Sequence, residues 1–382
     1  MSAKVISKFT IHLEMESQVE LTTLTPIWTG GVETGKMDRI HETGLIGSMR
    51  WWYEVIVRGL GGEICDPTSD KPEGRCQFDT KSYEITRNID DGLASVCPVC
   101  RLFGCTGWKR RFELQASATL SEPFWLATKD NETVLNHRWL SGIYKTVDSV
   151  DSYISFGELT LCFRWMRGYE SQHENMRALL SLMSQLGAIG PRSQYGFGIV
   201  DYKNSFSITQ SLSLIQNNIG GSGLKKNLSG VYPSLDDYWL LQSTVPAGDV
   251  NREFASANEI GNSKAFLNHK LRLLPVSFDI RYKWPGSDDK GLRQSYRLAH
   301  DKMPTRQIFG TSEGNKLASS VFVSHLYKSN VTETGYQLRV WGFTDSGLAD
   351  EIEASLKIIF PTLVVSQKLK GTELLSGSEV SA

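Results

Sequence analysis

The sequence from Thr25 to Arg58 decides the fold of this chain, and it reads TPIWTGGVETGKMDRIHETGLIGSMRWWYEVIVR. Pro26 is expected to end a strand, because a glycine turn and a short polar loop follow it. A helix should then begin near Gly44. Apolar residues recur there at the spacing of one buried helical stripe, and charged residues at the spacing of ion pairs lie on another face. The stripe comprises Leu45, Met49, Trp52 and Ile56, and the ion-pairing residues are Arg50, Glu54 and Arg58.

The start of this helix and the loop before it have features of a phosphate site. Gly44 and Gly47 lower the helix propensity, but they also let a backbone or a phosphate approach the free amides of the first turn. A loop that adds Arg39 and Trp28 to those amides could hold a single-stranded nucleic-acid backbone. The alternative is a plain strand–loop–helix whose glycines only make turns.

The composition is that of a globular chain of 382 residues, a length for which about two domains are expected. Hydrophobic residues make up 40%, which is enough for globular cores. The formal net charge is -1, so any binding to nucleic acid must use a local basic patch. The first 15 residues lack the apolar region of a secretory signal, and no run reaches the roughly 18 apolar residues of a membrane helix. We therefore expect a cytoplasmic protein.

Four of the six cysteines lie in a stretch that is rich in Gly, Pro, Asp and Lys and has little periodicity. Such a segment offers too little apolar area to offset the entropy of ordering it. Zinc bound by four thiolates would supply the missing folding energy, and a closed site of this kind is structural, not catalytic. The alternative is that some of these cysteines are free. The predicted ligands are Cys65, Cys76, Cys97 and Cys100, with Cys105 or His41 as a replacement for one of them and Cys162 as a packing residue.

Two amphipathic helices are predicted besides the one that follows Thr43. The first should begin at a capping box formed by Ser171 and Glu174 and end at Gly187. The second should begin near Ser346 and end before Pro361. The expected strands cover residues 9–24, 114–120, 159–165, 199–202, 274–280, 319–326 and 338–341.

Composition divides the chain into two domains joined by a segment rich in Gly, Ser and Asn. The first domain carries the cysteine-rich insertion and a glycine-rich loop, and a small polar tail is expected to be disordered. The predicted bounds are 1–216 for the first domain, with the insertion at 61–100 and the glycine-rich loop at 187–198; 217–262 for a linker or mobile loop; 263–375 for the second domain; and 376–382 for the tail.

A weak internal repeat indicates that the two domains share one fold. Leu102-Phe103-Gly104, followed by a few polar residues and a strand, recurs as Ile308-Phe309-Gly310 with the same sequel. In both halves a later strand leads into an amphipathic helix. We therefore predict an α+β fold of two tandem ferredoxin-like (RRM-like) domains, with antiparallel sheets, helices on one face and a zinc-stapled insertion in the first.

Two short stretches combine cations with aromatic residues, a pairing that suits phosphate contacts and base stacking. One is Trp108 with the three cations that follow it, and the other lies in the glycine-rich loop, whose amides can approach a nucleic-acid strand. A charge run alone is usually a solvated face, but two such patches in one half favour nucleic-acid binding. The candidate RNA-binding residues are Trp28, Arg39, Arg50, Lys109, Arg110, Arg111, Arg192 and Tyr195.

Signals for catalysis are weak. Asp38 and His41 are neighbours in the key loop, where a general acid–base role is conceivable. The sequence has no nucleophile motif, no P-loop and no paired metal-binding carboxylate motif. We therefore expect a protein that is not an enzyme.

Four segments resemble a known family. Residues 26–31 (PIWTGG) and 44–52 (GLIGSMRWW) resemble the signature of the first subunit of the Cmr module, the type III-B CRISPR effector complex. Residues 100–104 (CRLFG) resemble a motif common in the wider RAMP superfamily, and residues 190–198 (GPRSQYGFG) resemble its glycine-rich loop. The resemblance covers about residues 15–200, and the second half carries no signature.

The resemblance implies an RNA-binding, non-catalytic capping subunit that acts in antiviral defence. Such a subunit would hold the 3′ part of the guide (CRISPR) RNA and contact the guide–target duplex and neighbouring RAMP subunits. In this family a repeated backbone subunit cuts the target RNA, and a large polymerase-like subunit makes the signalling nucleotide. RNA contact carries over to Arg39, Arg50, Arg192 and Tyr195, whereas Trp51 and Trp52 are expected to pack in the core. The cysteine-rich insertion has no counterpart that we can match in the subunit family, although zinc sites occur among RAMP proteins.

Two other hypotheses stay open on the sequence alone. The first is a metal-independent endoribonuclease of the same superfamily, which would process guide precursor RNA with His41 as acid or base. The second is a structural adaptor that contacts only protein.

Overall fold

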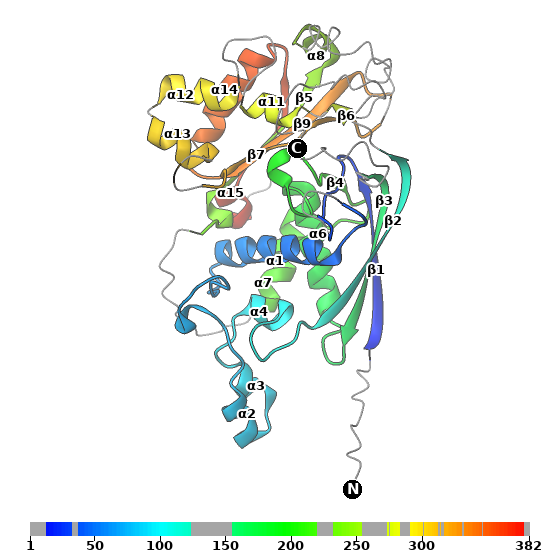
Figure 1. The fold of residues 1–382 in the computed structure, drawn as a ribbon, viewed down its shortest axis with the longest axis vertical. Helices are drawn as coiled ribbons and strands as arrows, with labels where there is room; N and C mark the ends of the chain where they lie inside the picture. Colours follow the sequence, from blue (N-terminus) through cyan, green and yellow to red (C-terminus); the bar gives the residue numbers. More distant parts are fainter. Residues whose placement is uncertain are drawn as a thin grey trace.

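The protein is described by a computed structural model, in which two α/β halves lie one above the other (Figure 1). None of the helices in the described part of the chain has both the length and the apolar character needed to cross a membrane. The described residues are 13–32, 37–123, 155–219, 232–253, 273–274, 276–282, 291–300, 302–311, 314, 317–330, 332–345 and 347–377.

The first half is built on an antiparallel sheet whose strands, among the described residues, lie in the order β2-β3-β1-β4. Val19 of β1 pairs with Leu161 of β3, and both side chains are buried. Helices α1 and α6 cover this face (Figure 1), whereas Gln18 and Glu20 are exposed. The elements are β1 (Leu13–Thr23), α1 (Glu42–Gly59), η1 (Pro72–Gly74), α2 (Thr80–Thr86), α3 (Ile89–Leu93), α4 (Pro98–Phe103), β2 (Phe112–Pro123), β3 (Ser155–Met166), α6 (Gln172–Leu186), η2 (Ser193–Tyr195), β4 (Val200–Asp201) and α7 (Ile208–Ile219).

Helix α1 has the two faces that its sequence predicts. The side chains of the apolar stripe, Leu45, Met49, Trp52 and Ile56, are all buried. On another face the Glu54 carboxylate accepts a hydrogen bond from Arg50 Nε at 3.0 Å and lies 3.7 Å from Arg58 Nη2. Trp51 and Trp52 pack against Phe343 of the second half, with ring centroids 5.3 and 5.8 Å apart, which confirms their packing role.

The second half contains a sheet in the order β10-β5-β9-β8-β6, with β7 paired to β9. Helices α12, α13 and α14 lie beside it (Figure 1). Its elements are η3 (Leu235–Asp237), β5 (Tyr238–Pro246), α8 (Ala247–Glu253), β6 (Leu273–Leu274), α11 (Ser277–Arg281), α12 (Leu292–Ala299), α13 (Lys302–Phe309), β7 (Val321–Val323), β8 (Leu326–Tyr327), β9 (Gly335–Phe343), α14 (Leu348–Ile359), β10 (Val364–Lys370) and α15 (Gly371–Ser376).

Strand β5 corrects the predicted linker or mobile loop over 217–262, because residues 238–246 form an inner strand of the second sheet. Its two faces enter different cores. Trp239 and Leu241 belong to the cluster that includes α14, whereas Tyr238 and Leu240 belong to the core of the first half. A strand buried on both faces shows no polar–apolar alternation, so the period-two pattern missed it.

Two other local predictions differ from the structure. The alternation over 274–280 is helix α11, preceded by the two-residue strand β6, and not one strand. Helix α6 ends at Gly187 as expected, but the Ser171 side chain does not cap it, because the Ser171 backbone is itself helical, with φ at -63° and ψ at -18°. The Glu174 carboxylate pairs with His173 and Arg177. The helix predicted between Ser346 and Pro361 lies where the sequence places it, as α14, and a further short helix, α15, follows β10. Residues 1–12 of the first predicted strand and residues 378–382 of the predicted tail lie outside the described part of the chain.

The predicted repeat is visible in the backbone. Gly104 and Gly310 each follow a helix, α4 or α13, and each has a positive φ, of 92° and 76°. The Leu102 carbonyl accepts a main-chain hydrogen bond from the residue just before β2, at 3.0 Å. The Ile308 carbonyl accepts the equivalent bond from the residue just before β7, at 2.9 Å. Each copy then enters a strand, β2 or β7. The two halves therefore share one helix–turn–strand device.

Candidate metal centre and nucleic-acid interface

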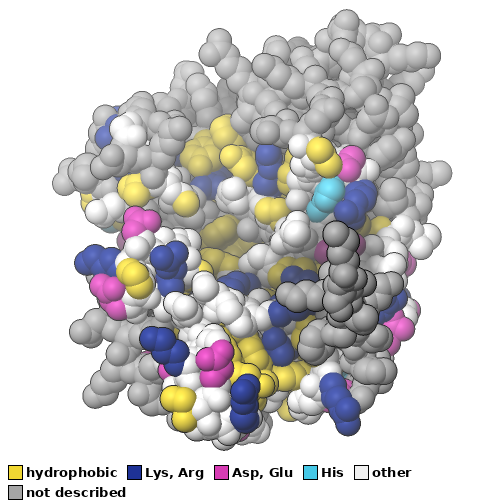
Figure 2. Space-filling model, turned by 60° about the horizontal axis from the view of Figure 1, so that its bottom comes forward, with side chains coloured by type: hydrophobic (Ala, Val, Ile, Leu, Met, Phe, Trp, Pro, Cys, Tyr) yellow, Lys and Arg dark blue, Asp and Glu magenta, His cyan; other side chains and the backbone are white. Residues whose placement is uncertain are grey.

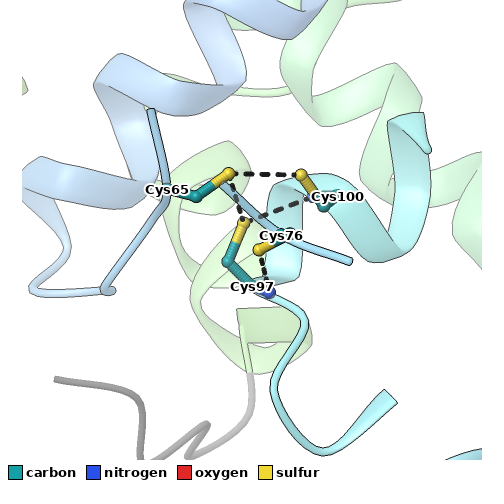
Figure 3. Close-up of side chains that lie close together, drawn as sticks. All are labelled: Cys65, Cys76, Cys97 and Cys100. Atoms are coloured by element: carbon teal, nitrogen blue, oxygen red, sulfur yellow. Dashed lines mark hydrogen bonds between the residues drawn. The ribbon is translucent and has the colours of Figure 1, made fainter. Parts of the chain in front are cut away.

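The four cysteines predicted as ligands converge in one buried cluster (Figure 3). Their sulfur atoms all lie within 4.8 Å of one another, and none of the four forms a disulfide. The Cys65 Sγ lies 3.4 Å from Cys100 Sγ and 3.9 Å from Cys97 Sγ. Four thiolates around one zinc ion are about 3.8 Å apart, since the Zn–S bond is about 2.3 Å. The donor set, the spacing and the burial therefore fit a closed four-thiolate metal site.

Two main-chain amides point at this cluster. The Cys97 N–H donates to Cys76 Sγ at 3.2 Å, and the Cys100 N–H donates to Cys97 Sγ at 3.5 Å. These bonds arise because Cys97 is the N-cap of α4, where the amides lack helical partners. Amide donors favour the thiolate form that a metal requires. Of the alternative ligands, Cys105 is not part of the cluster and His41 pairs with Asp38 instead.

The Arg50 side chain is held at the cysteine cluster by three hydrogen bonds. Its Nη2 donates to Cys100 Sγ at 3.2 Å and its Nη1 to the Gly104 carbonyl at 3.0 Å, while Nε binds Glu54. Four thiolates and one divalent cation would carry a net charge of about -2, and this guanidinium would compensate part of it. The structure thus gives Arg50, predicted as an RNA contact, a role that links α1 to the cysteine cluster.

The glycine-rich loop closes over the segment that precedes α1. A Cβ added at Gly44 would lie 3.0 Å from the Thr29 carbonyl oxygen, and a Cβ added at Gly190 would lie 3.2 Å from the Trp28 carbonyl oxygen. The Gly198 N–H donates to the Pro26 carbonyl at 2.9 Å. These glycines therefore allow two main-chain segments to lie in direct contact.

Arg192 occupies an unusual position at the tip of this loop. Its backbone is left-handed, with φ at 68°, a conformation that costs a non-glycine residue about 1 kcal/mol or more. The guanidinium carbon lies 4.6 Å from the centre of the Trp28 ring and 5.8 Å from that of Tyr195. Trp28 itself is buried, so it supports Arg192 and does not offer a free face for a base.

The polar loop before α1 contains two ion pairs. Arg39 Nη1 lies 3.1 Å from Glu42, and the Arg39 side chain is 59% exposed. His41 Nε2 lies 2.8 Å from Asp38 Oδ1, and this hydrogen bond holds the pKa of the Asp38 carboxyl below its ordinary value. The main-chain N–H of His41 donates to Thr29 Oγ1 at 2.9 Å, which fixes the start of the helix.

The basic run after Trp108 is partly engaged within the protein. The Arg111 guanidinium lies 3.5 Å from the centre of the Trp108 ring, and the Phe78 ring stacks on Trp108 at 5.3 Å. Trp108 therefore cannot stack on a base. Arg110 lies over the Phe112 ring, whereas Lys109 extends toward Glu113 with its side chain 55% exposed.

A cleft of about 1090 Å³ lies between the two halves. Its walls are the start of α1, the glycine-rich loop, the turn after Gly310, and helices α11 and α12. Arg192, Arg281 and Arg293 line it, and its described lining includes no Asp or Glu. On the face shown in Figure 2, Lys and Arg side chains likewise lie beside hydrophobic side chains around a central hollow. The sequence pattern does not single out Arg281, because the alternation over 274–280 predicts a strand where the structure has α11. Arg192 and Tyr195, which the sequence predicts to contact RNA, line the same cleft.

Comparison with known proteins agrees with the motifs of the first half. The family model of the RAMP superfamily matches residues 20–201. Residues 20–201, slightly less than half of the chain, are therefore similar to the RAMP superfamily. The RAMP region therefore contains the cysteine cluster, α1 and the glycine-rich loop, whereas the second sheet lies outside the matched residues. No curated protein matches the chain in sequence.

Solved structures with distant similarity include two from Cmr systems. The crystal structure of apo Cmr1 from Pyrococcus furiosus shares 14% identity, with 87% of this chain and 88% of that chain covered and a TM-score of 0.43. The cryo-EM structure of the type III-B Cmr-beta bound to cognate target RNA and AMPPnP, in the presence of ssDNA, shares 12% identity, with 90% and 99% coverage and a TM-score of 0.36. At these values neither similarity establishes a function for this chain.

Proposed function

We propose that this protein is a non-catalytic, RNA-binding capping subunit of a type III-B CRISPR (Cmr) effector complex. In that role it holds the 3′ part of the guide RNA and contacts the guide–target duplex beside other RAMP subunits. The RAMP match over residues 20–201 supports the superfamily, and the signature-like segments 26–31 and 44–52 favour the Cmr module. We also propose that each half is a ferredoxin-like unit, because β1-α1-β2-β3-α6-β4 and the strand order β2-β3-β1-β4 fit that topology.

The observation that carries RNA binding is the position of Arg192. Arg192 has a strained left-handed backbone, and its guanidinium packs against the Trp28 ring. It lies at a cleft that is lined by arginines and by no described carboxylate. Strain of this kind is concentrated at functional sites, and cations without nearby carboxylates attract phosphate. The proposed contacts are Arg192 and Tyr195, with exposed Arg39 and Lys109 extending the surface.

We propose that the four-cysteine cluster holds a structural zinc ion. When bound, zinc crosslinks the loop after α1, the segment around η1 and helix α4. Cys65, Cys76, Cys97 and Cys100 would hold it, and Arg50 would compensate its excess negative charge. Because α1 also forms one wall of the cleft, the metal would fix the helix that faces the RNA.

A salt titration of RNA binding by the full chain tests the proposal. Affinity for single-stranded RNA should fall steeply between about 50 and about 200 mM salt, because phosphate contacts release counterions. The RNA should remain uncut during the incubation. An affinity that does not change with salt would refute phosphate recognition.

The Asp38–His41 pair favours one second function, guide-precursor cleavage by an endoribonuclease of the RAMP superfamily. The pair has the geometry in which a carboxylate orients an imidazole, with 2.8 Å between Nε2 and Oδ1. Incubation with guide precursor RNA separates the two functions. Cleavage that is lost in His41→Ala would replace the capping role with this one.

A further inference from the structure

Helices α2 and α3 project from the first half, at the opposite end of the molecule from the second half (Figure 1). We call the segment that carries them, residues 77–96 between Cys76 and Cys97, the arm. Both cysteines belong to the buried cluster, and the Cys97 N–H donates to Cys76 Sγ at 3.2 Å. The two ends of the arm therefore lie side by side at its base, and the helices extend from there into solvent.

The arm is held in shape by its own residues. Asp79 and Asn88 cap α2 and α3, because each side chain accepts a hydrogen bond at 3.1 Å from a main-chain N–H of the helix that follows it. At the base, the Phe78 ring stacks on Trp108, and Gly92 lies so close to Phe78 that an added Cβ would overlap the ring. A segment that is ordered before binding loses little conformational entropy when a partner docks.

Two isoleucines at the tip of the arm face solvent. Ile85 of α2 is 83% exposed, and Ile89, the first residue of α3, is 44% exposed. None of the seven residues of α2 is buried. Four residues of chain span at most about 14 Å, so both side chains lie within the width of one contact surface. One exposed apolar side chain is ordinary, but two at the tip of a projecting, ordered segment are typical of an interaction site.

The charge around these isoleucines is negative. The stretch 61–97, which contains the arm, has eight carboxylates against four Lys or Arg side chains, a net charge of -4 in a chain whose net charge is -1. Glu84 and Asp90, next to Ile85 and Ile89, are exposed. Such a surface repels phosphate groups and attracts Lys and Arg side chains. The tip of the arm therefore fits a protein surface and not a nucleic acid.

We propose that the arm docks on another protein subunit, which presents an apolar pocket with Lys or Arg side chains at its rim. Ile85 enters the pocket, Ile89 packs at its edge, and Glu84 and Asp90 face the cations. This arrangement has the apolar centre and polar rim of a specific protein interface. The proposal rests on the proposed function, since the partner is then a protein of the same effector complex, and it adds the surface through which that partner recognises this chain.

The test compares Ile85→Ser with Ile358→Ser in the full chain. Ile358 is the matched control, because it is also an exposed helix residue, at 63%, but lies on α14. Serine and isoleucine have similar helix propensities, so both folds should persist. The probes are the other protein subunits of the Cmr module, each purified without RNA and titrated singly against the labelled chain. We expect one subunit to bind, Ile85→Ser to weaken that binding by about tenfold or more, and Ile358→Ser to leave it unchanged.

A charge variant and an RNA titration complete the test. Glu84→Gln combined with Asp90→Asn should weaken the same binding by about threefold and reduce its salt dependence, and it serves if the arm of Ile85→Ser becomes sensitive to protease. Wild-type affinity in both variants would overturn the docking proposal, as would a wild-type chain that binds RNA but no subunit. RNA affinity that falls in Ile85→Ser would overturn it in favour of an RNA surface. A chain that binds neither RNA nor any subunit would overturn the proposed function instead.

Discussion

The Arg339 Nη1 lies 2.9 Å from the Gly187 carbonyl oxygen. A side chain from β9 of the second half therefore caps the C-terminal end of α6 in the first half. The same nitrogen donates to the Ser184 carbonyl at 2.8 Å, and Nε donates to Gln242 at 3.0 Å. A cation at a helix C-terminus satisfies carbonyls that lack helical partners and interacts favourably with the helix dipole. Because Arg339 is only 8% exposed, these bonds join the two halves in a buried setting.

Replacing Arg339 should therefore destabilise the whole chain. Arg339→Met retains much of the side-chain volume but leaves two carbonyls and Gln242 without their donor. We expect a loss of about 2 to 3 kcal/mol in the free energy of unfolding, measured by urea denaturation. Arg164→Met is the matched control, because Arg164 is a strand arginine whose side chain is 47% exposed beside Glu16. An exposed pair contributes at most about 1 kcal/mol. Equal losses in the two variants would contradict the capping role.

Elemental analysis should find about one zinc per chain, since a structural site is nearly filled. Cys100→Ser should lose the metal and make the segment between Cys65 and Cys97 sensitive to protease, because that segment depends on the crosslink. Cys162→Ser is the control: Cys162 lies on β3, outside the cluster. Less than about half an equivalent of zinc in the wild-type chain would refute the site.

Arg192→Ala should weaken RNA binding by about 1 kcal/mol or more and reduce its salt dependence by about one phosphate contact. Alanine meets the same positive φ, so the backbone strain is unchanged and the readout isolates the guanidinium. Arg164→Ala serves as the control, because Arg164 is an exposed arginine of β3 that does not line the cleft. Fluorescence anisotropy at two salt concentrations measures both quantities. If the two variants bind RNA equally well, Arg192 is not a phosphate contact.

The sequence predicted the cysteine cluster and α1 because their signals are local. The spacing and composition around Cys97 and Cys100 predicted a crosslink, and the four cysteines do converge. The helical period of Leu45 and Met49 predicted one buried face, and both side chains are buried. The repeat at Gly310 was also detectable, because a positive φ and a tight turn constrain which residue is allowed.

The rest of the site depends on contacts between segments far apart in the chain. Tyr238 and Leu240 pack on the first half while their neighbours face the second core, so no periodicity marks β5. Arg50 satisfies the pattern of an RNA contact, but its guanidinium donates to Cys100 Sγ and to the Gly104 carbonyl and so is held at the cysteine cluster. The cleft requires both halves at once, and no single stretch of sequence carries that information.

Gly196→Ala should disrupt the contact between the glycine-rich loop and the second half. An added Cβ lies 2.7 Å from the His325 main-chain nitrogen and 2.8 Å from Ser277 Cβ, at a φ of 90°. Strain and overpacking together should cost about 3 kcal/mol or more. Gly30→Ala is the control, with a φ of 80° and nothing within 4 Å, and should cost only about 1 to 2 kcal/mol. Urea denaturation measures both, and equal losses would exclude a steric role for Gly196.

His325 should make the contact between the halves sensitive to acid. Its ring is fully buried against Phe197, with centroids 5.2 Å apart; Nδ1 lies 3.3 Å from the Ser277 amide, and Nε2 has no partner. Burial lowers its pKa from 6.5 to about 3. At a pH between those two pKa values the imidazole is protonated in the unfolded chain but not in the folded chain, so the free energy of unfolding decreases as the pH falls.

The loss that His325 contributes between pH 7 and pH 5 should be about 2 kcal/mol, since about 1.5 pH units lie below the unfolded pKa. Urea denaturation at the two pH values measures it. His325→Asn keeps an acceptor for the Ser277 amide but does not titrate, so its stability should depend less on pH by that amount. If wild type and His325→Asn lose the same stability over this interval, the imidazole stays uncharged in both states or is solvated in the folded protein, and the acid sensitivity of the interface has another source.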